Sequence, residues 1–326
     1  MYTAIISPSA RIPSILTYQR NTLRYFGSTG KHASVSGDDR EGSFKIGSTI
    51  KPIKMAYSSY ESTNPTVSSS DWPVIIMHGL MGSKSNWNSL SKVIHSKTKR
   101  KIFAVDARNH GESPHTAELS YHHLAEDVRA LMQDLGIKQG LMIGHSMGGR
   151  AMMLLALKYP ELVEKLIVVD ISPIGSSPNL STLPKYIDGM RMVKLDSSVP
   201  LSKARKIADE QMAILIPDAG IRQFFLTNLV EVSPGHYKWR VNLEAIARNI
   251  SQLCSFPPTA SSFDKPTYFI GGADSDYIRR EEHSEIRRYF PEAKFAYIKG
   301  AGHWVHSEKP NEFIDLATQF ILESKG

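Results

Sequence analysis

The sequence predicts an α/β protein with a mostly parallel β-sheet, helices on both faces of that sheet, and an inserted helical cap. Short, continuous apolar runs recur along the 326-residue chain and alternate with segments whose apolar residues follow helical spacing. Continuous apolar runs are typical of parallel strands that are covered on both faces. Between residues 172 and 262 this alternation stops and helical patterns follow one another, which predicts the cap.

The first elements lead into the sheet. Residues 44–61 alternate weakly between apolar and polar side chains, which favours paired edge strands. Residues 62–72 are rich in turn-forming residues and predict a loop. The apolar runs at 74–77 and 102–105 then predict the first two buried strands.

The remaining core elements continue the alternation of strand and helix. Residues 121–135 predict a helix, because their apolar side chains recur at helical spacing and Gly136 can cap its end. The predicted core of alternating strands and helices comprises residues 44–171 and 263–322, on either side of the cap. Further strands are predicted at 141–143, 166–169, 267–270 and 295–298, and further helices at 152–157 and 313–321.

The inserted cap, residues 172–262, begins with a turn-rich stretch and then shows four helical patterns, near 185–193, 201–214, 220–230 and 242–253. Its apolar side chains can line a pocket for an acyl chain, or they can pack the cap on itself. For any single one of them, packing is the simpler interpretation. These side chains are Ile187, Met190, Met192, Met212, Leu215, Phe224, Phe225 and Leu229.

Residues 1–37 contain four basic residues and no acidic one, so they supply four of the seven net positive charges. They are rich in serine and threonine and lack the continuous apolar stretch of a secretory signal. This composition is typical of a mitochondrial transit peptide, here followed by a linker. The Arg-Tyr-Phe sequence at 24–26 resembles an R-x-F processing site, with cleavage near Gly27. We therefore expect the protein to reside in the mitochondrion, in its matrix.

The composition also argues against several classes of protein. Cys254 is the only cysteine, so neither an intrachain disulfide nor a cysteine-based zinc site is expected. No run approaches 18 consecutive apolar residues, so no transmembrane helix is expected. Basic and aromatic residues do not interleave as they do on nucleic-acid-binding surfaces. His306 lies three residues after His303 without a third ligand nearby in sequence, and we expect neither a metal nor a cofactor.

Residues 144–149 read Gly-His-Ser-Met-Gly-Gly and directly follow a predicted strand. The pattern G-x-S-x-G between a strand and a helix places its serine on a tight turn, with the hydroxyl open to a substrate and a base. Small residues at 144 and 148 let this turn pass close to the neighbouring strands. Ser146 is therefore the candidate nucleophile.

A serine nucleophile needs a base, and the base needs an acid that orients it. His303 follows the last predicted strand, in Gly-Ala-Gly-His-Trp, and is the candidate base. Asp170 ends the strand after the nucleophile motif, whereas Asp274 and Asp276 follow the next strand. All three keep the order Ser, Asp, His. Position after the penultimate strand favours Asp274, although aspartates are common in surface turns, whereas an aspartate that ends a buried strand is unusual and favours Asp170.

Ester cleavage also needs two backbone N–H groups that face the developing negative charge. The candidates are Met147, directly after the nucleophile, and Leu80, in the His-Gly-Leu-Met-Gly loop after the first buried strand. Asp106, Arg108 and His110 follow another strand, and we expect them to brace neighbouring loops rather than react.

Together, four motifs resemble the alpha/beta-hydrolase superfamily over about residues 45–322: His-Gly, Asp-x-Arg-x-His-Gly-x-Ser, Gly-x-Ser-x-Gly and Gly-x-Gly-His. More narrowly, HGLMGSKSNW, DARNHGES, GHSMGG, VVDISP and AGHWVHSEKP resemble the mitochondrial alpha/beta-hydrolase domain-containing protein 11 family, whose relatives include bacterial esterases and fungal ethanol acetyltransferases. In that family the acid lies at the VDISP position, which implies Asp170 here. The resemblance also implies hydrolysis of esters or lipids, with diacylglycerol as a substrate class, and an association with the 2-oxoglutarate dehydrogenase complex.

We therefore expect a serine hydrolase that cleaves carboxylic esters, of lipids or acylglycerols, through Ser146, His303 and Asp170 and an acyl-enzyme. An acyltransferase that passes the acyl group to an alcohol would use the same residues. A binding or chaperone role with an idle triad is a different class, and it predicts that the cellular function survives the loss of Ser146. A reaction like that of haloalkane dehalogenases is disfavoured, because its nucleophile would be an aspartate.

Overall fold

The structure, a computed structural model, describes residues 50–62, 72–175 and 181–323. The chain divides into two compact units, Met1–Gly47 and Ser48–Gly326, and every described residue belongs to the second. The predicted transit peptide and linker therefore lie outside the described residues, as does the start of the predicted edge-strand segment.

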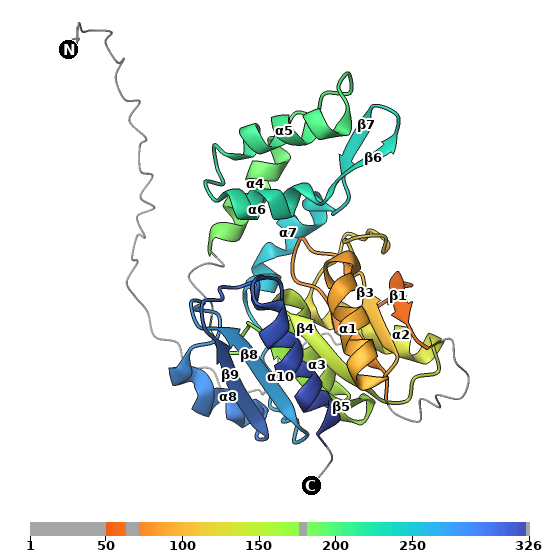
Figure 1. The fold of residues 1–326 in the computed structure, drawn as a ribbon, viewed down its shortest axis with the longest axis vertical. Coiled ribbons are helices and arrows are strands. Elements are labelled where there is room, and N and C mark those ends of the chain that lie inside the picture. The colour runs from red at the N-terminus through yellow and green to blue at the C-terminus, as the bar shows by residue number, and fades with distance from the viewer. Residues whose placement is uncertain (1–49, 63–71, 176–180, 324–326) are drawn as a thin grey trace, which may run out of the picture. The chain divides into compact units, whose positions relative to one another are not determined.

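The described elements alternate between strand and helix at both ends of the chain, with a mainly helical stretch between β5 and β8 (Figure 1). In chain order they are β1 (Tyr57–Tyr60), β2 (Val74–Met77), α1 (Asn88–Thr98), β3 (Ile102–Val105), α2 (Tyr121–Asp134), β4 (Gly140–His145), α3 (Met147–Lys158), β5 (Val163–Val169), α4 (Leu183–Arg191), α5 (Leu201–Met212), α6 (Ala219–Leu226), β6 (Leu229–Ser233), β7 (His236–Trp239), α7 (Leu243–Cys254), β8 (Thr267–Gly272), α8 (His283–Tyr289), β9 (Ala293–Ile298), α9 (Val305–Glu308) and α10 (Pro310–Leu322).

The main sheet has seven strands in the order β1-β3-β2-β4-β5-β8-β9. β1 runs antiparallel to β3 at one edge, and all other neighbours pair in parallel. This arrangement confirms the predicted α/β fold class with a mostly parallel sheet. Of the paired edge strands predicted within 44–61, the described part contains one, β1, which lies at the edge of the sheet and pairs with β3, whereas residues 50–56 form no strand.

Helices cover both faces of the sheet, and successive strand residues face opposite sides. Val74 and Ile76 of β2 pack with the apolar residues of α1 and α10, which lie on the face turned toward the viewer in Figure 1. Ile75 and Met77 pack with α2 and α3 on the other face. Because both sides are buried, the strands need apolar residues at every position, which explains the continuous runs in the sequence.

The insertion between β5 and β8 contains α4 to α7 and a two-stranded hairpin, β6–β7. The predicted helix at 220–230 is wrong beyond Leu226, where α6 ends. Residues 229–233 instead pair antiparallel with 236–239. Their apolar and polar side chains alternate, and Gly235 adopts a φ of 73°, which a tight hairpin turn requires.

No helix among the described residues has the length and apolar character needed to span a lipid bilayer. The features that matter for function lie at one edge of the sheet. The carboxyl ends of the parallel strands all meet there, and the loops that follow β2, β4, β5, β8 and β9 carry the candidate residues of the site.

Candidate active site

Ser146 lies between β4 and α3, at the N-cap of the helix, with φ 51° and ψ −116°. A positive φ is strained for a residue with a Cβ, and such strain is retained where the surrounding structure fixes it. The fixing contacts are close. A Cβ on Gly144 would lie 2.3 Å from the carbonyl oxygen of Gly148, and one on Gly148 would lie 2.5 Å from that of Met77. The turn therefore holds the serine outward at the edge of the sheet.

His303 and Asp170 are joined directly. Nδ1 of His303 donates to Oδ2 of Asp170 at 2.8 Å. Asp170 follows β5, has a φ of 48° and is fully buried. A buried carboxylate is costly unless its oxygens are bonded. The backbone N–H of Gly272 and the hydroxyl of Ser275 supply the other two donors, at 3.0 and 2.5 Å.

Asp274 and Asp276, the alternative acids, lie outside this contact. Asp274 is exposed, and its backbone N–H donates to the carbonyl oxygen of Ala301 in a turn. Asp276 is half-buried in the same loop. The residue of this loop that reaches the acid is Ser275, between the two aspartates. Sequence reasoning missed this serine, because only the pairing of β5 with β8 brings its loop beside Asp170.

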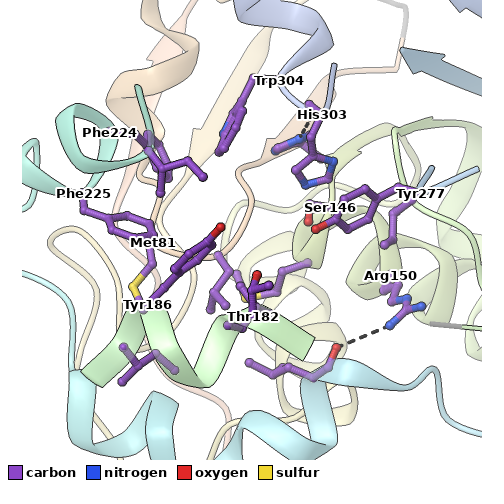
Figure 2. A pocket seen from close by; sticks show the side chains of 18 of the residues that line it. Met81, Ser146, Arg150, Thr182, Tyr186, Phe224, Phe225, Tyr277, His303 and Trp304 are labelled. Carbon is purple, nitrogen blue, oxygen red and sulfur yellow. Dashed lines mark hydrogen bonds between the residues drawn. The ribbon is translucent and has the colours of Figure 1, made fainter. Parts of the chain in front are cut away.

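Ser146 and His303 line the same pocket and point into it (Figure 2). Among the described residues no hydrogen bond joins the two side chains, a common state of a nucleophile and its base before substrate binds. The imidazole of His303 stacks on the ring of Tyr277, with the centroids 3.8 Å apart and the planes 19° apart. Nε2 of His145 donates to the carbonyl oxygen of His303 at 2.9 Å. These contacts fix the loop and the plane of the base.

Leu80 and Met147, the predicted donors to an oxyanion, both line this pocket. Met147 is the first residue of α3, so its N–H has no acceptor within the helix. In the described ranges, neither its N–H nor that of Leu80 donates to another protein group. Two free N–H donors in the pocket that Ser146 lines suit an incoming negative oxygen.

The loop that carries Leu80 is braced by two buried histidines. His78 donates from Nδ1 to the carbonyl oxygen of Gly79 and accepts at Nε2 from the N–H of Ala107. Nε2 of His110 accepts from the N–H of Met81 at 3.2 Å. Burial lowers the pKa of His110 to about 3, so its ring is neutral at physiological pH and can accept this bond.

Asp106 and Arg108 hold the neighbouring loops. Asp106 accepts from the backbone N–H and from Nζ of Lys84, at 2.7 and 2.6 Å. Arg108 makes two 2.7 Å bonds to the carboxylate of Asp127, and both side chains are almost fully buried. The prediction that Asp106, Arg108 and His110 brace loops is confirmed by these bonds.

The pocket has a volume of about 250 Å³ and lies between the sheet edge and the insertion. Its lining is mainly apolar and aromatic. Three of the eight predicted cap residues line it: Ile187, Phe224 and Phe225. Of the other five, Met190, Met212 and Leu229 are buried within the insertion, Leu215 is half-buried and Met192 is exposed. Sequence reasoning missed further lining residues, including Tyr186, Ile221, Tyr277 and Trp304.

Sequence reasoning also missed Arg150 of α3. Its buried guanidinium donates to the carbonyl oxygens of Ser172, Gly175 and Cys254, each at 3.0 Å. The first two lie where the insertion leaves the core, and Cys254 lies at its other end. One side chain on the nucleophile helix therefore anchors both ends of the insertion. No sequence pattern marks this contact, because it joins segments about a hundred residues apart.

Metal-binding side chains are not grouped at this edge. Within residues 50–62, 72–175 and 181–323, no cluster of three or more histidine, cysteine, aspartate or glutamate side chains is placed to hold a metal ion. The groups that the site itself presents are a serine hydroxyl, an imidazole, a carboxylate and backbone N–H donors.

Comparisons with known proteins agree with this geometry. The profile of the family described as "alpha/beta hydrolase fold" matches residues 73–310. The "sn-1-specific diacylglycerol lipase ABHD11" of Mus musculus is 43% identical over 274 residues, covering 83% of this chain and 86% of that protein. The "Ethanol acetyltransferase 1" of Wickerhamomyces ciferrii is 30% identical over 83% of this chain and 74% of that protein. Among solved structures, "Marine microorganism esterase" matches with a TM-score of 0.74 and 32% identity, over 82% of this chain and 99% of that one.

Proposed function

The chain belongs to the alpha/beta hydrolase fold family and is a serine hydrolase of carboxylic esters that acts on lipid esters, and from that premise we propose that Ser146, His303 and Asp170 carry out the reaction. One observation supports this assignment above the others. The 2.8 Å bond between His303 and Asp170 orients the imidazole in the pocket that Ser146 lines from its strained turn.

In the proposed mechanism, Oγ of Ser146 attacks the ester carbonyl carbon while Nε2 of His303 takes the hydroxyl proton. Asp170 holds the imidazole by its Nδ1–H and stabilises the imidazolium that forms. The N–H groups of Leu80 and Met147 bond the oxyanion, and His303 then gives the proton to the departing alcohol. Water, activated by His303 in turn, releases the acyl group from Ser146 as a carboxylic acid.

We propose diacylglycerol as the substrate class. Its support is the activity for which the mouse relative is named and the apolar, aromatic lining of the pocket, which suits an acyl chain. The test is a panel of simple esters, thioesters and diacylglycerols, with Ser146→Ala as the control. We expect diacylglycerols to be cleaved with the highest kcat/KM, and the control to cleave none of the panel. Cleavage of short esters alone would contradict the proposed class, though not the ester hydrolase.

Transfer of the acyl group to an alcohol is the second candidate, because a relative at 30% identity is named as an ethanol acetyltransferase. The chemistry up to the acyl-enzyme is the same in both cases. The two candidates differ in whether water or an alcohol attacks the acyl group, so the products formed in the presence of ethanol separate them.

We also propose that the protein resides in the mitochondrial matrix and associates there with the 2-oxoglutarate dehydrogenase complex. The support is the basic, serine- and threonine-rich composition of residues 1–37 for the compartment, and the family resemblance for the partner. We expect residues 1–37 fused to a reporter to enter mitochondria, and the tagged full chain to co-purify with the complex. Retention of the fusion in the cytosol would contradict the proposed mitochondrial localisation. A cellular function that survives in Ser146→Ala would point to a binding role instead of catalysis.

A further inference from the structure

A tyrosine that the proposed mechanism does not use lies against the catalytic histidine. Tyr277 follows β8, and its ring stacks on the imidazole of His303 with the centroids 3.8 Å apart. We propose that the hydroxyl of Tyr277 is a further catalytic group, which donates a hydrogen bond to the oxygen of the departing alcohol. This proposal rests on the proposed function of Ser146 and His303 and adds a donor on the leaving-group side of the ester.

The first argument is that this hydroxyl has no partner within the protein. The hydrogen bond that Tyr277 makes in the described part of the chain comes from its backbone N–H and goes to Oγ of Ser275, at 3.3 Å. Its hydroxyl is not sealed off in the protein interior, and the residue lines the substrate pocket. By contrast, Tyr121, which lines the same pocket, donates its hydroxyl proton to the carbonyl oxygen of Leu253 at 2.6 Å. The hydroxyl of Tyr277 is therefore available to a substrate.

The second argument is the place where the stacked ring holds this hydroxyl. Nδ1 of His303 bonds to Asp170, so Nε2 is the nitrogen that serves the substrate. In Figure 2 the side chain of Tyr277 lies beside the imidazole and points into the pocket, toward Ser146. The imidazole must approach the departing oxygen to protonate it. A hydroxyl on the ring stacked against that imidazole is therefore on the side from which the alcohol leaves.

The other ester oxygen, that of the carbonyl group, already has donors. The N–H groups of Leu80 and Met147 come from the loop after β2 and from the first residue of α3. Tyr277 comes from neither segment, because its loop follows β8 and its ring packs on the base. The two oxygens of the ester are thus served from different elements, and the hydroxyl of Tyr277 suits the leaving oxygen.

The chemistry of a phenol fits a donor that keeps its own proton. Burial raises the pKa of Tyr277, so the hydroxyl stays protonated at physiological pH. When the bond between the acyl carbon and the leaving oxygen breaks, its electron pair stays on that oxygen, and a donor beside the developing charge stabilises the transition state. His303 transfers its proton to the same oxygen. The alcohol then departs, and Tyr277 is left unchanged.

The experiment compares two butyrate esters that differ in their leaving group. p-Nitrophenolate is a weak base that departs with little help, whereas ethoxide is a strong base that needs a donor. For the full-length protein, kcat/KM is measured with each ester, because this constant contains only the steps up to the acyl-enzyme. Tyr277→Phe keeps the stacked ring and removes the hydroxyl. We expect its kcat/KM to fall about tenfold for ethyl butyrate, the effect of a hydrogen bond to a developing charge, and to stay within about twofold for p-nitrophenyl butyrate.

The matched control is Tyr57→Phe, the same substitution at an exposed tyrosine of β1 outside the pocket, and it should leave both constants unchanged. A fluorophosphonate probe expels fluoride instead of an alcohol. It should label Tyr277→Phe at nearly the wild-type rate, which would show that the nucleophile and the base are in place. Tyr277→Leu is a second variant should Tyr277→Phe fail to fold. It also loses the stacked ring, but its ratio of the two constants should fall about tenfold as well.

The ratio of kcat/KM for ethyl butyrate to that for p-nitrophenyl butyrate decides the outcome. A wild-type ratio in a folded Tyr277→Phe or Tyr277→Leu protein, whether both constants are kept or both fall, would overturn the role of the hydroxyl and leave the ester hydrolase intact. If the wild-type protein cleaves neither ester and is not labelled by the probe, the proposed function itself fails.

Discussion

Replacing Ser146 with alanine is expected to lower kcat for ester cleavage by about 10⁴ to 10⁶. The hydroxyl is the atom that forms the acyl-enzyme, and no neighbouring group can replace it. Alanine also has a Cβ, so it is subject to the same backbone strain at φ 51°, and the turn should survive. Steady-state turnover of an ester substrate measures the loss, and covalent labelling with a fluorophosphonate probe measures it independently.

Ser251→Ala is the matched control, because Ser251 is an exposed serine of α7 that does not line the pocket. It should keep wild-type turnover and labelling, and both variants should unfold at the wild-type temperature. Labelling of the Ser146→Ala protein at the wild-type level would show that the nucleophile is another residue.

Asp170→Asn is expected to lower kcat by about 10⁴. In the wild-type protein, Nδ1–H of His303 donates to a buried carboxylate at 2.8 Å, which leaves Nε2 as the acceptor for the serine proton. An amide brings an NH₂ group to the same place, which favours the wrong tautomer of the imidazole and gives no charge to stabilise the imidazolium. The kcat of purified variants, measured with one ester over a range of pH, tests this expectation.

Asp274→Asn is the natural comparison, because Asp274 is exposed and the hydrogen bond from its backbone N–H to Ala301 does not involve the carboxylate. We expect it to retain nearly full activity. An inactive Asp274→Asn together with an active Asp170→Asn would show that the acid is assigned to the wrong loop. Loss of activity in both variants would indicate that the loop of Asp274 supports the position of Asp170. Ser275→Ala, which removes the hydrogen bond from this loop to Asp170, tests that support.

The core of the fold could be predicted from the sequence because its signals are local. A strand covered on both faces favours apolar residues at successive positions, so β2 and β3 appear as uninterrupted apolar runs, and β5 does so from Leu166 to its end. The turn at Ser146 carries its own glycines, at 144 and 148, because the backbone crosses another strand within van der Waals distance.

Features that depend on contacts between distant segments could not be predicted in this way. The hairpin β6–β7 follows a helix without a break in the apolar pattern, so the sequence favours helix where the hairpin begins. The helix α1 has only three apolar residues, Leu90, Val93 and Ile94, and this short pattern is too weak to predict it. Tyr277 reaches His303 from another loop, and only the folded sheet brings them together.

The identity of the acid also depends on the folded sheet. Parallel neighbours place the ends of β5 and β8 at one edge, so an aspartate after either strand can reach the histidine. The extent of burial distinguishes the two candidate acids in the structure. Asp170 is fully buried and held by three donors, whereas Asp274 faces solvent.

The guanidinium of Arg150 has a consequence for how this architecture can diversify. Both stems of the insertion are tied to one point on the helix that follows the nucleophile. A segment closed at its base can be lengthened or exchanged at a small entropic cost, because the cost of closing a loop grows only with the logarithm of its length. Substitutions between the two stems would then alter which acyl chains fit the pocket, while the catalytic residues keep their positions. Selectivity and reactivity can therefore evolve on separate parts of one polypeptide.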